Sequence, residues 1–544
     1  MIRKTFLSGL FLLATSMHVG QATDPASAPP GTHGLDVKTQ AGEQALLSTP
    51  AIRTFLSAIR ADKFQIHQGR MYQPDIRLLA CMGILPSCNG NNNKNPYLVA
   101  TVPTPGRPYD PRLPTLNFQM RQDEAVVLIG RTPPPVSYFS FRTFVVNRWV
   151  ERESVRRKVF PSLGDPNNML TFNTLGKSKG DPFDRAFVLM IVSDKGTEAR
   201  IRKALKTAGF LDEIINRDVI SPNLAKMSSK SNGDFDEEKD DDFTALMRFA
   251  LWEYGYEEAG QEYLDNPPVV VLRLTPNPRT EKASYSPIPL DRLRPRGTGL
   301  TELDLTPEVD ALRAGILARY PQMEADELRP TTWLEESFVA LQKDLDVLGE
   351  SRDTVYLRSE GTFTLAEDEF LMVYGVNHEA TGKATYANFA IYDVCKACPY
   401  AGENSRRVAG SALEYFPDPD PKKRPPHVDS LYAWKLARHC NGDPNCTEVP
   451  YGDNCTTELP LGREMWVGFR AYVEPATKIG PAFSELLYDR VVKFTPAAPH
   501  ITNVTVSPEA ATDIDTGVPV TTPVTITFRP VPTPIPRPTP GRRP

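Results

Sequence analysis

The sequence predicts a multi-domain α+β fold: a mixed α/β block, then helices, then a β-rich, sandwich-like C-terminal domain. The chain has 544 residues, enough for several domains of about 100–200 residues each. Fifty-two of them are prolines, against a usual share of about 5%, which disfavours long helices. Strand and helix patterns alternate in the middle of the chain, and short strand patterns dominate the part that follows.

Residues 1–22 are typical of a secretory signal peptide. Arg3 and Lys4 form a positive start, 6–14 is an apolar stretch, and cleavage is expected after Ala22. We therefore expect an exported protein, secreted or periplasmic and in either case extracytoplasmic. No later segment approaches the ~18 apolar residues that span a bilayer, so no transmembrane segment is expected in the mature chain.

Residues 23–115 are expected to be an irregular N-terminal segment. Its one helical pattern covers 51–61, where four apolar residues recur at helical spacing. Prolines punctuate 103–114, which is predicted to be a linker to the next domain.

Residues 116–300 are predicted to form the α/β domain. Seven consecutive apolar residues, 186–192, are typical of a strand buried on both faces. Asp194 follows this strand, a helical pattern comes next, and Gly209 is suited to end the helix. A further strand beginning near Val219 would complete a βαβ-like unit. Other strands of this domain are expected at 125–129, 138–146 and 269–274.

A second helix of this domain is expected at 243–254. Its apolar residues lie at helical spacing: Phe243, Leu246, Met247, Ala250, Leu251 and Tyr254. Asp241 and Asp242 would stand at its start, where carboxylates stabilise the helix dipole. The acidic run 234–242 departs from the calcium-binding EF-hand pattern and is predicted to be a solvated loop.

Residues 301–350 are predicted to be a helical connector. Pro307 suits the first turn of one helix, and a second packing helix is expected through Leu334, Phe338, Leu341, Leu345 and Leu348. Residues 351–495 should form the β-rich, disulfide-containing domain. Its strands are expected at 354–357, 370–376, 385–392, 431–436, 465–473 and 490–494.

The last part of the chain is predicted to add little to the folded core. Residues 496–528 contain two alternating stretches that can form a small β extension. Residues 529–544 are a Pro-rich tail, expected to be extended and semi-rigid like polyproline II.

The cysteines are predicted to form structural disulfides, because cysteines in the loops of an exported chain normally do. Cys81 and Cys88 are the natural local pair. Several pairings remain open among the other cysteines, and the odd total leaves one unpaired. The seven are Cys81, Cys88, Cys395, Cys398, Cys440, Cys446 and Cys455. Metal or redox use of Cys395 and Cys398 is not favoured, since no second C-x-x-C pair accompanies them.

Composition and motifs exclude several classes of function. The net charge is −5 and basic clusters are short, so a nucleic-acid partner is not expected. The sequence has no phosphate-binding loop, dinucleotide fingerprint, nucleophile elbow or zinc-protease motif. We therefore predict no cofactor and no metal.

Three residues are candidate acid–base groups. Asp194 follows a buried strand, at the edge where ligands of open α/β sheets collect, although it can equally cap the next helix. His378 stands beside a carboxylate in a predicted hairpin loop, and Asp165 lies in a turn rich in side-chain oxygens.

Two functions follow from these observations. The first is an exported protein that binds an unknown extracytoplasmic ligand or surface without catalysis, which the missing catalytic motifs favour. The alternative is an exported hydrolase that uses Asp165, Asp194 or His378 for acid–base chemistry.

Overall fold

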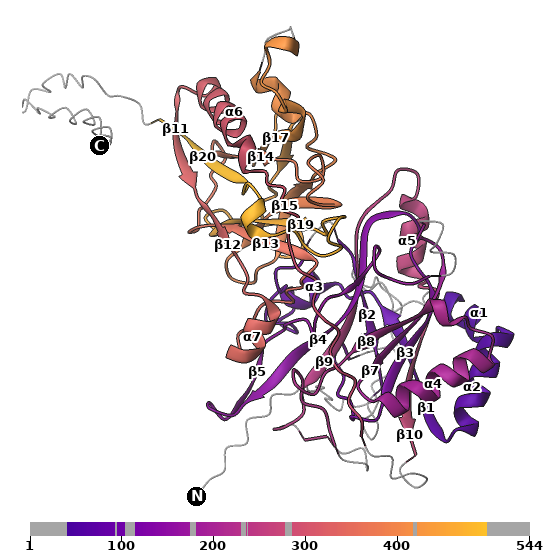
Figure 1. The fold of residues 1–544 in the computed structure, drawn as a ribbon. Helices are drawn as coiled ribbons and strands as arrows, with labels where there is room; N and C mark the ends of the chain where they lie inside the picture. The colour runs from indigo at the N-terminus through magenta and orange to yellow at the C-terminus, as the bar shows by residue number, and fades with distance from the viewer. Residues whose placement is uncertain are drawn as a thin grey trace, which may run out of the picture. The chain divides into compact units, whose positions relative to one another are not determined.

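The computed structural model describes residues 41–92, 95–103, 115–174, 181–229, 235–236, 238–277, 285–416 and 421–497. The predicted signal peptide lies outside the described residues, as does everything after residue 497, where the β extension and the Pro-rich tail were expected. The fold is mixed α+β and mostly sheet, with one large sheet in the first half of the chain and two smaller ones in the second (Figure 1).

The large sheet has ten strands, and neighbouring strands are antiparallel except for β7 and β8. Helix α4 (Lys195–Thr207) connects that parallel pair, so the predicted βαβ-like unit is present. Its last strand ends at Val219 rather than beginning there. The strand order is β5 (Val155–Lys158), β4 (Val136–Val150), β9 (Asp242–Trp252), β2 (Tyr97–Thr101), β1 (Phe64–Tyr72), β10 (Val269–Pro276), β3 (Ala125–Arg131), β7 (Ala186–Val192) and β8 (Ile215–Val219), with β6 (Asn167–Asn168) beside β4.

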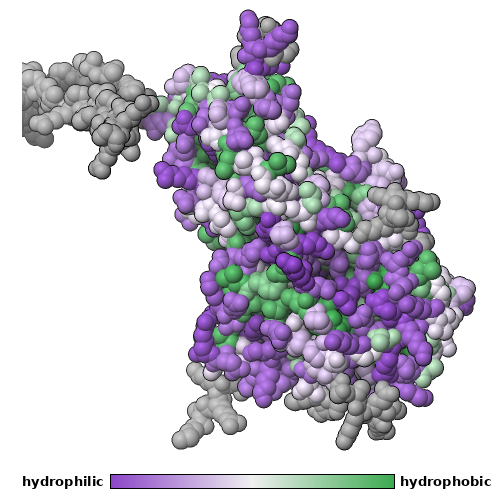
Figure 2. All heavy atoms as spheres, viewed as in Figure 1, coloured by the Kyte–Doolittle hydropathy of each residue, from purple (hydrophilic) through white to green (hydrophobic). Residues whose placement is uncertain are grey.

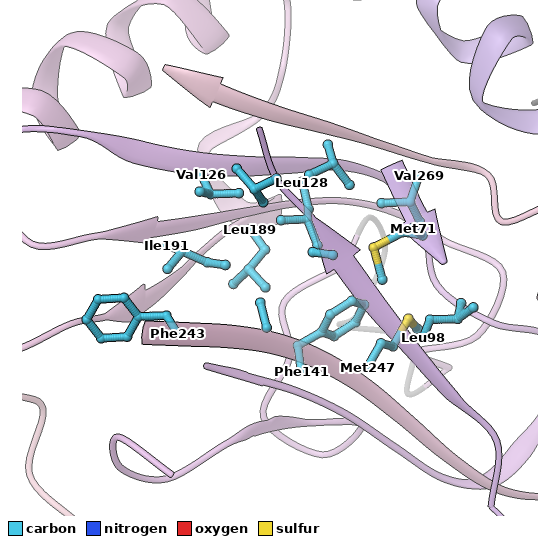
Figure 3. Close-up of a cluster of buried hydrophobic side chains, with 14 of the residues drawn as sticks. Met71, Leu98, Val126, Leu128, Phe141, Leu189, Ile191, Phe243, Met247 and Val269 are labelled. Carbon is cyan, nitrogen blue, oxygen red and sulfur yellow. The ribbon is translucent and has the colours of Figure 1, made fainter. Parts of the chain in front are cut away.

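Both faces of this sheet are buried. Phe187, Leu189 and Ile191 of β7 point into one apolar cluster, which Figure 3 shows. Val188 and Met190 point into a second cluster on the other face, under α1 (Ala41–Leu47), α2 (Pro50–Ala61) and α4. Successive side chains of a strand point to opposite faces, so a strand covered on both sides must be apolar throughout.

The helix predicted at 243–254 is wrong, because this segment is strand β9. Phe243, Met247 and Phe249 alternate along the strand into the first apolar cluster. Leu246 points to the other face, so apolar residues lie on both faces of the strand, and their spacing by itself also fits a helix. Long pairing with β4 and a shorter one with β2 decide in favour of the strand.

The stretch 23–115 is not irregular where the structure describes it. It contains α1, α2 and α3 (Ile76–Cys81), and strands β1 and β2 lie in the middle of the large sheet. Helix α2 follows the prediction within one residue, with Thr49 as its N-cap. Strand β1 carries Gln65, His67, Gln68 and Arg70, and these polar residues conceal its strand pattern in the sequence.

The second half of the chain contains two five-stranded sheets. One has the order β11 (Met323–Leu328), β20 (Arg490–Pro496), β14 (Phe370–Val376), β17 (Leu431–Ala437) and β18 (Cys446–Glu448). The other has the order β12 (Pro330–Thr332), β13 (Thr354–Ser359), β19 (Met465–Tyr472), β15 (Tyr386–Asp393) and β16 (Pro399–Asn404). One buried cluster contains side chains of both sheets, among them Val373 and Phe469.

The connector 301–350 contains two helices and two strands. Helix α6 (Thr306–Arg319) has Pro307 in its first turn and packs Val309, Leu312 and Ile316 against the outer face of β14 and β20. The second predicted helix is shorter than expected, since α7 covers only Ser337–Lys343 and Asp344 turns into the left-handed region at φ +53°. No helix in the described part of the chain is long and apolar enough to cross a membrane.

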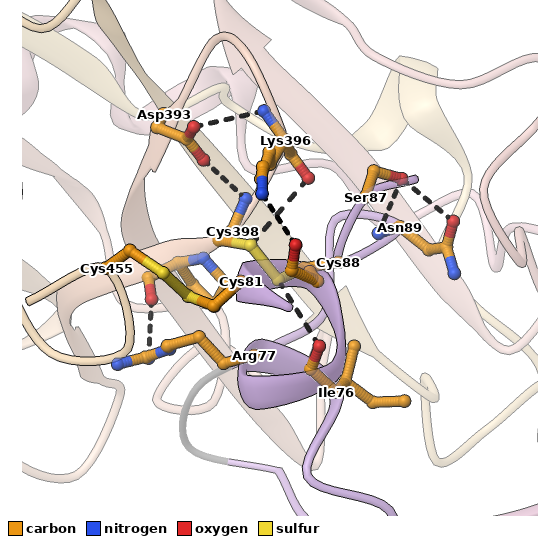
Figure 4. The surroundings of a disulfide bond; sticks show 12 residues. Ile76, Arg77, Cys81, Ser87, Cys88, Asn89, Asp393, Lys396, Cys398 and Cys455 are labelled. Carbon is orange, nitrogen blue, oxygen red and sulfur yellow. Dashed lines mark hydrogen bonds between the residues drawn. A yellow bond between two sulfur atoms is a disulfide. The ribbon is translucent and has the colours of Figure 1, made fainter. Parts of the chain in front are cut away.

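The structure contains three disulfides, and the predicted local pair Cys81–Cys88 is wrong. Cys81 instead bonds to Cys455 and Cys88 to Cys398, across 374 and 310 residues of chain. Figure 4 shows how α3 and the loop after it lie against the 393–398 turn, where Lys396 Nζ donates to Ala80 O at 2.6 Å. The remaining pair is Cys440–Cys446, and Cys395 is free and exposed.

We expect the long-range disulfide to stabilise the protein more than the short one. Replacing Cys88 and Cys398 by Ser should lower the free energy of unfolding by about 2–5 kcal/mol, because a cross-link over a long loop removes more entropy from the unfolded chain. Urea unfolding of the oxidised protein measures this loss. The matched control replaces Cys440 and Cys446, whose loop spans only six residues, and should lose less. A non-reduced peptide map containing a Cys81–Cys88 cross-link contradicts the pairing.

Candidate functional site

The candidate residue Asp194 is the N-cap of helix α4. Its carboxylate accepts a hydrogen bond from Thr197 N at 2.7 Å and a second from Ser286 N at 2.7 Å. Both oxygens are therefore used to hold the helix start and a neighbouring segment, which is the capping contact that the sequence allows.

Asp165 is also engaged in structural contacts. One carboxylate oxygen accepts from Arg352 Nε at 2.8 Å, and the other from Arg294 N at 2.6 Å. The side chain is 10% exposed and pairs with a guanidinium that also bonds Glu336. The carboxylate thus joins the 161–165 turn to two other segments.

His378 lies buried between two carboxylates. Its Nδ1 is 2.9 Å from Glu302 and its Nε2 is 3.4 Å from Asp489, which also accepts from Tyr432 OH at 2.5 Å. Burial by itself lowers the pKa of His378, but the two carboxylates outweigh it and hold that pKa well above 6.5. The result is a buried, positively charged imidazolium with two anionic partners.

The structure does not bring the three candidates together in one pocket. His378 lines a cavity of about 20 Å³ in the second half of the chain, room for about one water molecule. Asp165 and Asp194 line none of the four best-formed pockets among the described residues. Nor do the described residues contain a cluster of three or more possible metal ligands. An acid–base role for these residues stays a prediction.

A much larger apolar pocket, of about 280 Å³, lies where the large sheet meets the second half of the chain. Figure 2 shows apolar side chains gathered on this face of the molecule. The volume lies just below the range of about 300–1,000 Å³ for small-molecule sites, and a mainly apolar lining with a few polar groups is typical of them. Its walls come from β2, β4, β9, β13 and β19, from the loop after α3 and from the segments around α7; the apolar lining includes Val99, Leu116, Val146, Phe160, Leu246, Trp333 and Leu348.

The charged lining of this pocket is one-sided. Lys158, Arg248 and Arg470 line it, and no described residue of the lining is Asp or Glu. Lys158 pairs outside the lining with Asp346 at 3.0 Å. The three cations differ in whether a carboxylate of the protein forms an ion pair with them.

Arg248 is neutralised by a buried ion pair. Its guanidinium donates to Asp353 Oδ1 at 2.5 Å and to Tyr138 OH at 2.6 Å, and Tyr138 in turn donates to Asp353. Arg248 comes from β9, whereas Asp353 directly precedes β13. The pair therefore joins the large sheet to the second half of the chain beside the pocket.

Arg470 has no such partner. It is 4% exposed and lies over the rings of Trp333, Tyr356 and Tyr392, with its carbon Cζ 5.0 Å from the centre of the Trp333 ring. Its hydrogen bonds go to Tyr392 OH and to Gly90 O, and it forms no ion pair with any carboxylate that the structure describes. A guanidinium stays charged in proteins, so this buried charge has no directly bonded carboxylate among the described residues.

The loop after α3 forms one edge of the pocket and is held in place from several sides. The Cys88–Cys398 disulfide anchors it, and Gly90 N donates to Ala397 O at 3.1 Å. Gly90 has φ +63°, and a Cβ there would lie 2.5 Å from the Trp333 ring. Glycine is therefore required where the loop backbone approaches Trp333 and presents its carbonyl to Arg470.

Sequence reasoning missed the pocket residues, although a signal for them exists. Arg470 is the one charged residue of β19, and Arg248 stands in β9 within the stretch 245–252, whose other residues are all apolar or aromatic. A charged residue in such a strand must be paired or must serve a ligand, because a buried, unpaired charge is costly. Acid–base motifs do not include this pattern.

Comparison with known proteins adds no family. No family model matches the chain, and no curated protein does. Among solved structures, the chain is similar to a putative uncharacterized protein from Burkholderia cenocepacia, with 11% identity, a TM-score of 0.35 and coverage of 84% of this chain and 94% of that one. It is also similar to the VPA0106 protein from Vibrio parahaemolyticus, with 11% identity, a TM-score of 0.32 and coverage of 84% and 99%. Similarity this low supports no transfer of function.

We expect the buried imidazolium to make stability depend on pH. The pKa of His378 is raised on folding, so its contribution is complete below pH 6.5 and is lost as pH rises toward the folded pKa. The free energy of unfolding should therefore fall as the pH rises above 6.5, by up to about 1.4 kcal/mol per pH unit from this group. Urea unfolding across this range measures the slope.

The control for this titration is the triple variant Glu302→Gln, His378→Gln, Asp489→Asn, which keeps the shape of the cluster but removes its charges. Its stability should fall less steeply with pH. An unchanged slope in the triple variant means that His378 is not the group responsible.

Proposed function

We propose that this chain is an exported ligand-binding protein whose binding site is the apolar pocket beside Arg470. The observation that carries this proposal is the composition of the pocket lining. It combines a large apolar surface with a few buried polar groups from separate elements, which is the usual character of small-molecule sites.

The same lining favours binding over hydrolysis. No described residue of the lining is Asp, Glu, His or Ser, and the one cysteine, Cys88, is held in a disulfide. These are the commonest groups in general acid–base and nucleophilic catalysis, and the one lysine of the lining, Lys158, is paired with Asp346. The alternative, an exported hydrolase using Asp165, Asp194 or His378, draws no comparable support, because Asp165 and Asp194 are occupied by structural contacts and His378 is buried between its own carboxylates.

An extracytoplasmic location belongs to this proposal. The predicted signal peptide motivates it, and the three disulfides are compatible with it, since such bonds persist where thiols oxidise. We further propose that the two five-stranded sheets form a sandwich-like domain, which the buried cluster shared by both supports. That domain supplies Tyr356 and Arg470 to the pocket.

Filling the pocket should weaken the binding of an apolar probe. Val146 is half-buried and lines the pocket from β4, so Val146→Trp places an indole in the cavity. We expect the neutral dye N-phenyl-1-naphthylamine to bind the wild type with enhanced fluorescence, and the variant at least about tenfold more weakly, a change of about 1.4 kcal/mol. Fluorescence titration measures both.

The matched control is Val155→Trp, which adds the same side chain at an exposed strand position outside the pocket. It should bind the dye like the wild type. Failure of the wild type to bind, or equal binding by Val146→Trp, speaks against the pocket as the site.

A further inference from the structure

We infer that the ligand of this pocket is a monoanionic amphiphile whose negative head group pairs with Arg470, an inference that rests on the proposed function. The class includes carboxylates and sulfonates with an apolar chain or ring system. Charge balance, the free hydrogen-bond donors around Arg470 and the apolar walls each support it.

Of the three positively charged side chains in the pocket lining, one has no carboxylate partner among the described residues. Asp353 neutralises Arg248 and Asp346 neutralises Lys158, whereas Arg470 has no carboxylate partner among the described residues. Asp489 shares the small neighbouring cavity with Arg470, but its carboxylate is bonded to Tyr432 and His378. A buried charge without a counter-ion is costly, and an anionic ligand would supply the missing partner.

Two buried tyrosines of the pocket lining each have a hydroxyl hydrogen with no acceptor among the described residues. Tyr472 OH accepts from Asn92 Nδ2 and from Asn95 Nδ2, each at 3.1 Å, and no described group accepts its own hydroxyl hydrogen. Tyr356 OH likewise accepts from Arg248 at 3.3 Å without a described acceptor for its hydrogen. Both tyrosines line the pocket, so both hydroxyls can donate to an anionic head group.

The rest of the lining suits an apolar body. Val99, Leu246, Phe160 and Leu348 come from four different segments and carry no hydrogen-bonding side chains. An apolar chain placed against them gains about 25 cal/mol for each Å² of surface removed from water. A ligand with one charged end and one apolar end satisfies both regions, whereas a neutral apolar compound satisfies only one.

The experiment compares two ligands that differ only at the head group. Decanoate and decan-1-ol displace N-phenyl-1-naphthylamine from the wild type, and we expect decanoate to bind at least about tenfold more tightly. In Arg470→Gln the preference should fall to about one while the dye still binds. Tyr472→Phe, which keeps the ring and removes one donor, should lower the preference part of the way and serves if Arg470→Gln does not fold.

The control variant is Lys239→Gln, which removes a positive charge at a side chain that is 77% exposed and outside the pocket. It should keep the full preference for decanoate. Equal displacement by decanoate and decan-1-ol in the wild type, or a preference that survives in folded Arg470→Gln, overturns the inference. If Arg470→Gln does not fold, an undiminished preference in Tyr472→Phe overturns it. Failure of the wild type to bind the dye is a different outcome, and it overturns the proposed function itself.

Discussion

The buried contact between Arg248 and Asp353 is the interaction on which the pocket depends. It joins β9, an interior strand of the ten-stranded sheet, to the residue directly before β13, with Tyr138 bonded to both partners. The Asp353 side chain is fully buried, so losing either charged group would leave the other uncompensated, at a cost of about 3–5 kcal/mol. The pair therefore fixes the two halves of the chain against each other where the pocket opens.

Disulfides and hydrogen bonds also join the first half of the chain to the second. The disulfides Cys81–Cys455 and Cys88–Cys398 tie α3 and its following loop to the second half of the chain. Asn92 continues the connection by exchanging hydrogen bonds with Asn388 at 3.0 and 3.1 Å. Covalent and polar contacts thus hold the edge of a cavity whose walls are largely apolar.

Much of the fold could be predicted where local pattern and tertiary environment agree. The seven apolar residues of β7 specify a strand buried on both faces, Asp194 and Thr197 specify a helix start, and β14 was predicted at its observed limits. In β9 the same reasoning failed, because its apolar residues satisfy both helical and strand spacing and only pairing with β4 and β2 distinguishes the two.

The sequence by itself determined the strand or helix character of strongly patterned segments, because that character depends on neighbours along the chain. It also showed that the chain carries cysteines able to form disulfides. Only the tertiary structure decided which cysteines pair and where the pocket lies. Cys88 meets Cys398 across 310 residues, and Trp333, Gly90 and Arg470 meet although they belong to three distant segments. Such contacts arise from the packing of whole sheets, and no local periodicity encodes them.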